Sequence, residues 1–211
     1  SGDTLTYGDE AGANTSISLG ISVNSIADLK AYTNLVDNKS IEVLGYYEAG
    51  DGGGGTFFWD ATSTEADNGG TIIEATAGGT GRWKRVGWDG DVRAFGARGD
   101  DSTDNTSDIQ RALDANDGRI LIPRGGVFRH TGTLNIVSPV TVEGSGTLRY
   151  FPSGDYSTGI NVTSDDVKFT DVTFQGTGTA KNFDVYRGVA IDLDSVSHID
   201  IIACEFKDYV G

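Results

Sequence analysis

After Gly118 the chain repeats one short pattern, in which two apolar residues flank a single variable residue. The pattern comes in groups of three, and the middle triplets of successive groups begin at Val140, Val167 and Ile199, which are 27 and 32 residues apart. Self-similarity with a period of about 20–50 residues is typical of solenoids. The nine triplets are Leu134–Ile136, Val140–Val142, Leu148–Tyr150, Ile160–Val162, Val167–Phe169, Val172–Phe174, Ile191–Leu193, Ile199–Ile201 and Cys204–Phe206.

The spacing within each triplet predicts a short strand with one buried face. Alternate residues of a strand face opposite sides, so both outer members of a triplet point inward. Each would stack on its equivalent in the next coil, about 4.8 Å away. Each buried Val, Ile, Leu or Phe stabilises by about 1.5–3 kcal/mol, but a single coil closes no core, so several coils must stack. Cys204 is expected inward, beneath Val172, as a small core residue.

The first part of the chain shows a different pattern. Residues 1–20 are polar and are predicted to be a linker. Ser25 and Asp28 resemble a capping box and, with apolar residues at helical spacing behind them, predict a helix over residues 26–36. Short apolar runs bounded by Gly, Asp or Asn then predict the strands of a small α+β module over residues 21–88. These runs are Ile41–Leu44, Thr56–Trp59, Thr71–Ile73 and Arg82–Val86.

The glycine run EAGDGGGGTFFWD, residues 48–60, raises the question of a phosphate-binding loop. Such a loop needs the pattern GxxxxGK[ST] between a strand and a helix, and here no Lys follows the glycines. The second glycine cluster, AGGTGRWKR at residues 77–85, lacks the motif as well. The residues after the first run alternate as in a strand, so the glycines are interpreted as a turn between two strands.

Composition excludes several classes of function. The 211 residues include 31 Gly and 3 Pro, which favours an all-β protein rich in turns. The formal net charge of −15 excludes nucleic acid and anionic lipid surfaces as partners. No apolar run approaches the roughly 18 residues that a membrane span needs, and the polar start shows no signal peptide. The only cysteine is Cys204, so no intrachain disulfide can form and the redox compartment stays open.

The acidic stretch that starts at Asp100 is not a calcium-binding EF-hand loop. Counting from Asp100, position 12 is Arg111, where a bidentate Glu is required. Ser107 and Gln110 instead suggest a capping box at the start of a helix over residues 107–115, with its acids near the positive end of the dipole. The apolar stripe of this helix is Ile109, Ala112 and Leu113. No metal site and no cofactor are expected.

The residues around this helix resemble a known family. FGARGDDSTDNT (95–106), IQRA (109–112) and GRILIPRG (118–125) look like the opening of the pectate-lyase-like β-helix superfamily. The preceding region, from SIADLKAY to GTGRWKRV, resembles a module found ahead of that opening in bacteriophage tailspikes and related depolymerases. This copy departs from the common form at Asp101, where Gly is usual, and at Asn105, where Asp is usual.

The resemblance implies a fold and a function. The expected fold is mainly β: a small N-terminal α+β anchor-like module, then a capping helix and the first coils of a right-handed single-stranded parallel β-helix over residues 89–211. The implied function is that of a phage tailspike, a virion tail protein outside the cell that binds and depolymerises bacterial capsule or O-antigen polysaccharide. Implied partners are the polysaccharide, two further copies in a homotrimer, and the virion baseplate or another tail protein.

Chemistry would have to lie on the outer face, where the middle residues of the triplets form ladders. The predicted ladders are Asn135, Asn161 and Asp192; Thr141, Lys168 and Asp200; and Arg149, Thr173 and Glu205. A glycosidase needs two carboxyl groups about 5–9.5 Å apart. Asp192 and Asp194, two residues apart and so about 6.6 Å along a strand, are the candidate catalytic pair. Asp192 could equally be a surface charge and Asp194 the start of a turn.

A lyase acting on a uronate would need a base, and Arg, Lys or a metal to neutralise the substrate carboxylate. Arg149 and Lys168 are cations on neighbouring coils but on different faces, and with Glu205 they are the candidate substrate-binding residues. His130 and His198 are interpreted as ordinary surface histidines. The aromatic pair of RWKRVGW, Trp83 and Trp88, is interpreted as core of the small module, with a carbohydrate-stacking platform as the alternative.

The chain stops just after the third coil, which suggests the N-terminal part of a longer protein, or a β-helix closed by a partner. The catalytic site is then expected outside this segment, whose own role would be structural. Two other functions stay open. One is a secreted bacterial lyase of the pectate or alginate type, and the other is a virion fibre that binds glycan without cleaving it.

Overall fold

The computed structural model describes residues 4–8, 14–18, 20–152, 158–177 and 189–208. The chain divides into two compact units. The N-terminal unit comprises residues 1–67 and 72–87, and the coiled unit comprises residues 68–71 and 88–211. Each unit has its own hydrophobic core. Within the segment predicted as a linker, β1 (Thr4–Gly8) pairs with β2 (Asn14–Ser18) as antiparallel strands.

The N-terminal unit is a five-stranded sheet with one helix. The strand order is β3-β4-β5-β7-β6, antiparallel except for the pairing of β3 with β4. Side chains alternate along β4 and β5, so one face of these strands is buried. The elements are β3 (Ser22–Val23), α1 (Ile26–Ala31), β4 (Ser40–Val43), β5 (Gly55–Asp60), β6 (Ile72–Ile73) and β7 (Arg82–Arg85). The core includes Leu29, Ile41, Val43, Phe57, Trp59, Ile73 and Trp83.

The start of α1 is confirmed and its predicted end is wrong. The Ser25 hydroxyl accepts from the Asp28 amide at 3.1 Å and donates to the Asp28 carboxylate at 2.9 Å. The helix ends at Ala31 rather than at residue 36. Tyr32 takes an extended backbone conformation (φ −68°, ψ 127°), and its ring packs edge-on against Trp83 with centroids 6.0 Å apart. Packing of Tyr32 on the core therefore outweighs the helical spacing of the residues behind it.

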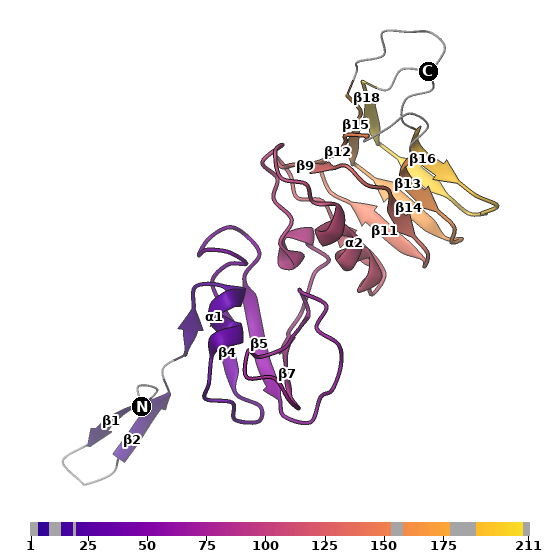
Figure 1. Cartoon of the computed structure of the whole chain (residues 1–211). Coiled ribbons are helices and arrows are strands. Elements are labelled where there is room, and N and C mark those ends of the chain that lie inside the picture. Colours follow the sequence, from indigo (N-terminus) through magenta and orange to yellow (C-terminus); the bar gives the residue numbers. More distant parts are fainter. Residues whose placement is uncertain (1–3, 9–13, 19, 153–157, 178–188, 209–211) are drawn as a thin grey trace. The chain divides into compact units, whose positions relative to one another are not determined.

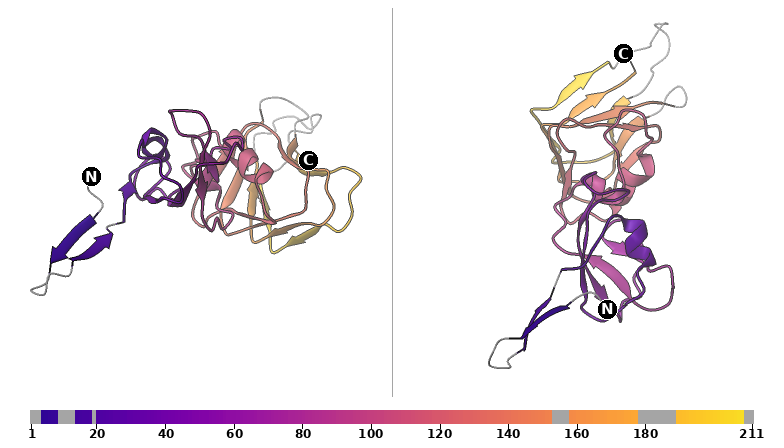
Figure 2. Two further views of the ribbon diagram at one scale, coloured as in Figure 1. Left: turned by 90° about the horizontal axis from the view of Figure 1, so that it is seen from below. Right: turned by 90° about the vertical axis from the view of Figure 1, so that its left-hand side faces the viewer.

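The coiled unit is a parallel β-helix, as predicted. Its strands form three separate sheets, β10-β13-β16, β17-β14-β11-β8 and β18-β15-β12-β9, and all of their pairings are parallel (Figures 1 and 2). The chain visits the sheets in turn, so each circuit adds one strand to each sheet. The helical elements are η1 (Val92–Phe95) and α2 (Thr106–Asp114). The strands are β8 (Arg119–Leu121), β9 (Val127–His130), β10 (Leu134–Ile136), β11 (Val140–Glu143), β12 (Thr147–Tyr150), β13 (Thr158–Val162), β14 (Val167–Thr170), β15 (Thr173–Gln175), β16 (Val189–Leu193), β17 (Asp200–Ile202) and β18 (Glu205–Lys207).

The predicted register holds in two sheets and fails in the third. Leu134, Ile160 and Ile191 align, as do Val142, Phe169 and Ile201. In the third sheet Leu148 aligns with Phe174 and Phe206, not with Val172 and Cys204. The turn before β12 holds one residue more than the turn before β15, and a two-residue slip keeps every side chain on the same face. Val172 is nevertheless buried, and Cys204 packs against the same core.

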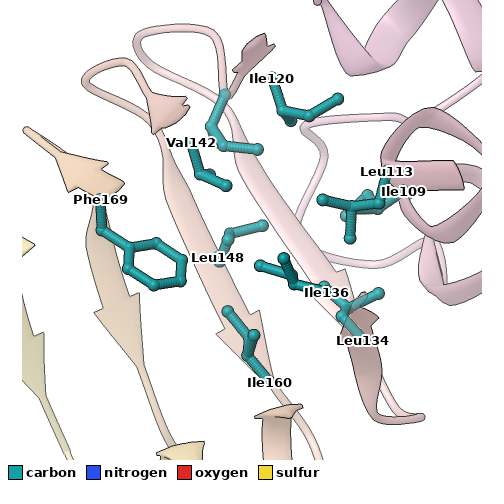
Figure 3. Close-up of a pocket in the computed structure, with 10 residues that line it drawn as sticks. Ile109, Leu113, Ile120, Leu134, Ile136, Val142, Leu148, Ile160 and Phe169 are labelled. Carbon is teal, nitrogen blue, oxygen red and sulfur yellow. The ribbon is translucent and has the colours of Figure 1, made fainter. Parts of the chain in front are cut away.

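The interior of the coils is apolar and tightly filled. A small cavity of about 10 Å³ remains near α2, lined only by apolar side chains that point into the bore (Figure 3). They come from α2 (Ile109, Leu113) and from strands of all three sheets (Ile120, Leu134, Ile136, Val142, Leu148, Ile160, Phe169), with Ile122 beside them. The predicted apolar stripe of the capping helix is therefore confirmed, and the cavity carries no group that could do chemistry.

The predicted capping box of α2 is wrong. The N-cap is Asn105, and Ser107 lies inside the helix. Gln110 has a different partner: its side-chain oxygen accepts from the Asn135 amide at 2.8 Å, and its nitrogen donates to the Asn135 carbonyl at 3.0 Å. One amide side chain thus makes the two hydrogen bonds that a neighbouring strand would make with the edge of β10. The helix therefore caps this sheet directly.

Candidate functional site

The outward side chains of the coiled unit form columns, because parallel strands in register place equivalent residues one above another. Asn135, Asn161 and Asp192 share one column, and the Asn161 amide donates to the Asn135 side-chain oxygen at 3.4 Å. The two members of the predicted catalytic pair, Asp192 and Asp194, are both exposed. The Asp194 amide donates to the Val162 carbonyl at 3.1 Å, and its carboxylate accepts from Ser195 at 3.1 Å. Asp194 thus opens a turn, and the pair stays a prediction.

Arg149 lies in a column of cationic and polar residues. Its Cα partners are Arg129 on β9 and Gln175 on β15, and Gln175 pairs in turn with Lys207 on β18. The predicted ladder of Arg149 with Thr173 and Glu205 is therefore wrong, for the reason of register given above. Thr173 and Glu205 belong to the adjacent column, above Thr147.

The guanidinium of Arg149 is held in place by two contacts. Its Nη1 lies 2.5 Å from a carboxylate oxygen of Asp101, in the loop before α2. Its Cζ lies 5.0 Å from the centroid of Phe151, and the Cζ of Arg129 lies 4.3 Å from the same centroid. Two guanidinium groups thus lie against one aromatic ring, at cation–π distance. Nη1 of Arg129 also donates to the Ser102 carbonyl at 3.2 Å.

The other two predicted substrate-binding residues lie apart from Arg149 in the strand pairing. Lys168 is on β14, where its Cα partners are Thr141 and Asp200, so it belongs to a different sheet. Glu205 is on the same sheet as Arg149, but its carboxylate pairs with Lys207 at 2.8 Å. The structure therefore does not join the three predicted residues into one site.

Sequence reasoning missed Arg129, because it began the coils at Leu134. The strand β9 (sequence VFRH) already shows alternate burial, with Phe128 and His130 inside and Arg129 outside. This alternation was the signal that could have placed Arg129 above Arg149. Phe151 and Asp101 lie outside the repeating triplets, so only the fold brings them to the column.

The loop before α2 is built by hydroxyl–carboxylate hydrogen bonds. Asp104 accepts from the hydroxyls of Thr106 at 2.6 Å and Thr131 at 2.5 Å. Partial burial raises the pKa of Asp104, but these hydrogen bonds outweigh it and lower the pKa to about 2. Asp100 is partly desolvated in the same way, and hydrogen bonds from Thr103 and Ser102 hold its pKa well below the usual range. Both carboxylates are therefore ionised structural acceptors.

His130 is buried, which corrects its interpretation as a surface histidine. Its ring stacks on Tyr150 with centroids 5.1 Å apart, and its Nδ1 lies 2.9 Å from the Gly132 carbonyl. Burial lowers the pKa of His130, although the Gly132 carbonyl and the negative charge of Asp104 oppose this. His130 is therefore a neutral core residue above about pH 6.5. His198 is exposed, as predicted.

The glycine run of the N-terminal unit forms a turn whose backbone amides already surround an acid. Asp51 accepts from the amides of Tyr46 (2.8 Å), Tyr47 (2.7 Å), Glu48 (3.1 Å) and Gly53 (2.8 Å). Burial raises the pKa of Asp51, but these amides lower it further than burial raises it. The backbone cradle that a phosphate would need is thus filled by the chain's own carboxylate.

The tryptophans do not form a carbohydrate platform. Trp83 is fully buried in the core of the N-terminal unit, edge-on to Trp59. Trp88 belongs to the other unit, where it packs edge-on to Phe95 with centroids 5.1 Å apart and donates to the Asp91 carbonyl at 3.1 Å. Trp83 and Trp88 therefore pack inside different units and do not offer a paired indole surface to a ligand.

Among the described residues, no group of three or more His, Cys, Asp or Glu side chains is arranged to hold a metal ion. No helix in the described part of the chain is long and apolar enough to cross a bilayer.

Comparison with known protein families matches residues 22–88 to the phage tail protein small four-stranded beta-sheet domain. This match coincides with the α+β module that the sequence predicts. It indicates a location in the virion tail and supports the resemblance to tailspikes.

Comparison with solved structures identifies the fold of the whole chain. The tailspike protein of Acinetobacter baumannii phage AM24 is 18% identical with a TM-score of 0.66, over 96% of this chain and 36% of that protein. The enzymatically active domain of tailspike protein 2 of bacteriophage CBA120 is 23% identical with a TM-score of 0.67, over 82% of this chain and 26% of that one. WceF of Pantoea stewartii, a glycan biofilm modifying enzyme with a tailspike-like parallel beta-helix fold, is 17% identical with a TM-score of 0.70, over 99% of this chain and 33% of WceF. The chain thus has the tailspike fold and spans about a third of the length of these proteins.

Proposed function

We propose that this chain, which has the fold of phage tailspikes, is the N-terminal part of a tailspike that binds and depolymerises a bacterial surface polysaccharide. The observation that carries the proposal is the order of the two parts. A module that matches a phage tail domain family is followed directly by the capped start of a parallel β-helix. A tail module supplies attachment to the particle, and a solenoid supplies a long, regular surface for a polymer.

Within this proposal the segment itself is mainly structural. The N-terminal unit joins the protein to the baseplate or to another tail protein, and the coiled unit starts the β-helix as part of a homotrimer. The catalytic groups are assigned to coils beyond residue 211 or to a groove between subunits.

The test uses the full-length protein and the capsular or O-antigen polysaccharide of its host. We expect the polysaccharide to shorten and new chain ends to appear. Reducing ends without an unsaturated product indicate hydrolysis, and ultraviolet absorbance of an unsaturated uronate indicates a lyase. Binding without shortening would instead support a non-catalytic virion fibre. Light scattering after size exclusion distinguishes a trimer from a monomer.

Deletion of residues 21–88 tests the proposed attachment. It should remove the protein from virus particles without abolishing cleavage.

A second candidate is a bacterial enzyme of the secreted pectate- or alginate-lyase type. The likeness to WceF favours it, because that protein is a bacterial glycan-modifying enzyme with the same fold. The match of residues 22–88 to a phage tail domain supports the first proposal instead. Detection of the protein in purified virions discriminates between the two.

A further inference from the structure

We propose that the outward column of Arg129, Arg149, Gln175 and Lys207 binds the carboxylate groups of an acidic polysaccharide. This column, called the arginine column below, runs across β9, β12, β15 and β18. The proposal rests on the proposed function and names the chemical class of the polymer: a saccharide that carries carboxylates, such as a uronate. It also assigns a binding surface to the first coils, in addition to any catalytic groove elsewhere.

The charges of the column are not balanced. Arg129 and Arg149 stand directly opposite each other on neighbouring strands, an arrangement of like charges that destabilises a sheet. Asp101 neutralises Arg149. Arg129 donates to a neutral carbonyl, that of Ser102, and within the described residues no ion pair joins it to a carboxylate. An otherwise acidic chain, with net charge −15, thus keeps an uncompensated cation at this point.

The two guanidinium groups are also held ready for a ligand. Both lie against the ring of Phe151, at 4.3 and 5.0 Å, and both are anchored through one nitrogen to the loop before α2. They emerge from strands whose flanking side chains, among them Phe128 and Leu148, are buried. A side chain that is already ordered loses less entropy on binding. A planar guanidinium suits a carboxylate, because it offers parallel donors to both oxygens.

The positive charge of the column decreases along its length. Gln175 donates to Asp208 at 2.9 Å, and Lys207 pairs with Glu205 at 2.8 Å, so the cationic character decreases toward β18. Successive members are about 4.8 Å apart, the distance between paired strands. The polymer therefore runs along the column, and its acidic groups bind most tightly at Arg129, whose charge no described ion pair offsets.

The column favours a saccharide over nucleic acid. A nucleic acid carries one charge for every phosphate and is repelled by the overall charge of −15. An acidic polysaccharide carries its charges farther apart, and its hydroxyls can use the polar neighbours Thr147 and Thr173 in the adjacent column.

The test is a calorimetric titration of the chain at low ionic strength with oligogalacturonate, and with the same oligomer fully methyl-esterified. We expect the acidic oligomer to bind at least about tenfold more tightly than its ester, because only the acid can pair with a guanidinium. The variant Arg129→Gln/Arg149→Gln should lose this preference. Arg124→Gln, a loss of charge at an exposed position of the same unit, is the matched control and should keep it.

Four results would overturn the proposal. They are no binding of the acidic oligomer, equal binding of acid and ester, an equal loss of the preference in Arg124→Gln, and equally tight binding of acetate at the same carboxylate concentration. The last would identify a site for simple anions. Far-UV circular dichroism verifies that each variant is folded, and Arg129→Lys, which keeps charge but not the planar fork, should bind with intermediate affinity. Depolymerisation by the full-length protein is measured separately. If the full-length protein cleaves its polysaccharide but the double variant keeps its preference for the acidic oligomer, the arginine column is refuted and the proposed function stays intact.

Discussion

At the scale of single residues, the two departures from the family's opening phrase both have a structural explanation. Asp101 has φ 58°, the left-handed region in which glycine is favoured, and its carboxylate pairs with Arg149. Asn105 is fully buried, and its Nδ2, which carries two hydrogens, lies 3.0 Å from each of the carbonyl oxygens of Arg98, Thr103 and Arg129, so that one hydrogen is shared. Its Oδ1 accepts from the Arg98 amide at 2.6 Å. Both side chains thus tie the loop before α2 to the first coil.

Replacing Asn105 by Asp should destabilise the coiled unit by about 2–4 kcal/mol at pH 7, because a carboxylate would face three carbonyl oxygens with nothing to donate. Urea unfolding measures the change. The loss should shrink as pH falls from 7 toward 4, because burial raises the pKa of the new carboxyl above its unfolded value of about 4 and a protonated Asp regains one donor. Asn34→Asp, the same change at an exposed position, should cost almost nothing. An unchanged midpoint in Asn105→Asp would show that the loop rearranges around the new acid.

His130 should make stability depend on pH. Its folded pKa lies below the unfolded value of about 6.5, so the unfolded chain takes up the proton first. Its contribution is therefore complete above about pH 6.5 and is lost as pH falls below that value, with a slope of at most about 1.4 kcal/mol per pH unit. Asp104 acts in a separate window, between its unfolded value near 4 and its folded pKa of about 2.

Unfolding midpoints measured between pH 7.5 and 5 test this dependence. The variant His198→Gln is the control, and it should keep the same slope of stability against pH. By NMR, the His130 ring should also titrate at a pH below the ordinary histidine value of about 6.5. A ring that titrates at or above pH 6.5 would contradict a buried neutral histidine.

At the scale of elements, the sequence predicted which helices and strands exist better than it predicted the register between strands and the residues at which elements end. The apolar triplets predicted the β-helix because they recur in groups of three at a solenoid-like spacing, and stacked coils then bury both outer members of every triplet. They left the register of β12 against β15 open, because Leu148 and Val172 face inward in either alignment. Turn length decided this register, and nothing local in the sequence marks the extra residue before Thr147. The same slip hid Gln175 and Lys207 in the column of Arg149, whereas Arg129 was missed because the coils were begun at Leu134.

Gln110 should contribute about 1–2 kcal/mol to the coiled unit through its two hydrogen bonds to Asn135. In Gln110→Ala the Asn135 amide loses its acceptor, so its hydrogen exchange should accelerate along with a lower unfolding midpoint. Ser107→Ala is the control on the same helix, since Ser107 makes no cap. A larger loss in Ser107→Ala than in Gln110→Ala would restore the capping box that the sequence suggested.

Replacing Ala203 by Gly should increase the stability of the coiled unit. It occupies the turn position equivalent to Gly144 and Asp171 and has φ 53°, a conformation that costs Ala about 1–2 kcal/mol. Ala203→Gly should stabilise by about 0.5–1 kcal/mol, after the extra freedom of glycine in the unfolded chain is subtracted. Asp171→Gly should gain less, because Asp tolerates this region. Thermal unfolding measures both, and a lower midpoint in Ala203→Gly would show that its methyl group packs usefully.

At the scale of the whole molecule, the division into two parts could be predicted because the pattern of apolar residues changes between them. The N-terminal unit buries a sheet against one helix, whereas the coiled unit buries a bore. The proposed arginine column could not be predicted in the same way. Arg129 and Arg149 come from separate coils, and Phe151 and Asp101 come from a strand end and a loop, so only three-dimensional packing joins them.

Because the two cores share no residue, core substitutions should act on separate unfolding transitions. Phe57 and Phe169 are both fully buried, one in each core, and truncation of either to Ala should cost about 3–5 kcal/mol. In differential scanning calorimetry, Phe57→Ala should lower one transition and Phe169→Ala the other, while Tyr47→Ala, at a residue that is 47% exposed, should leave both nearly unchanged. If both core variants lower one common transition equally, the units unfold as a single cooperative body. Loss of the N-terminal core would then also melt the start of the β-helix.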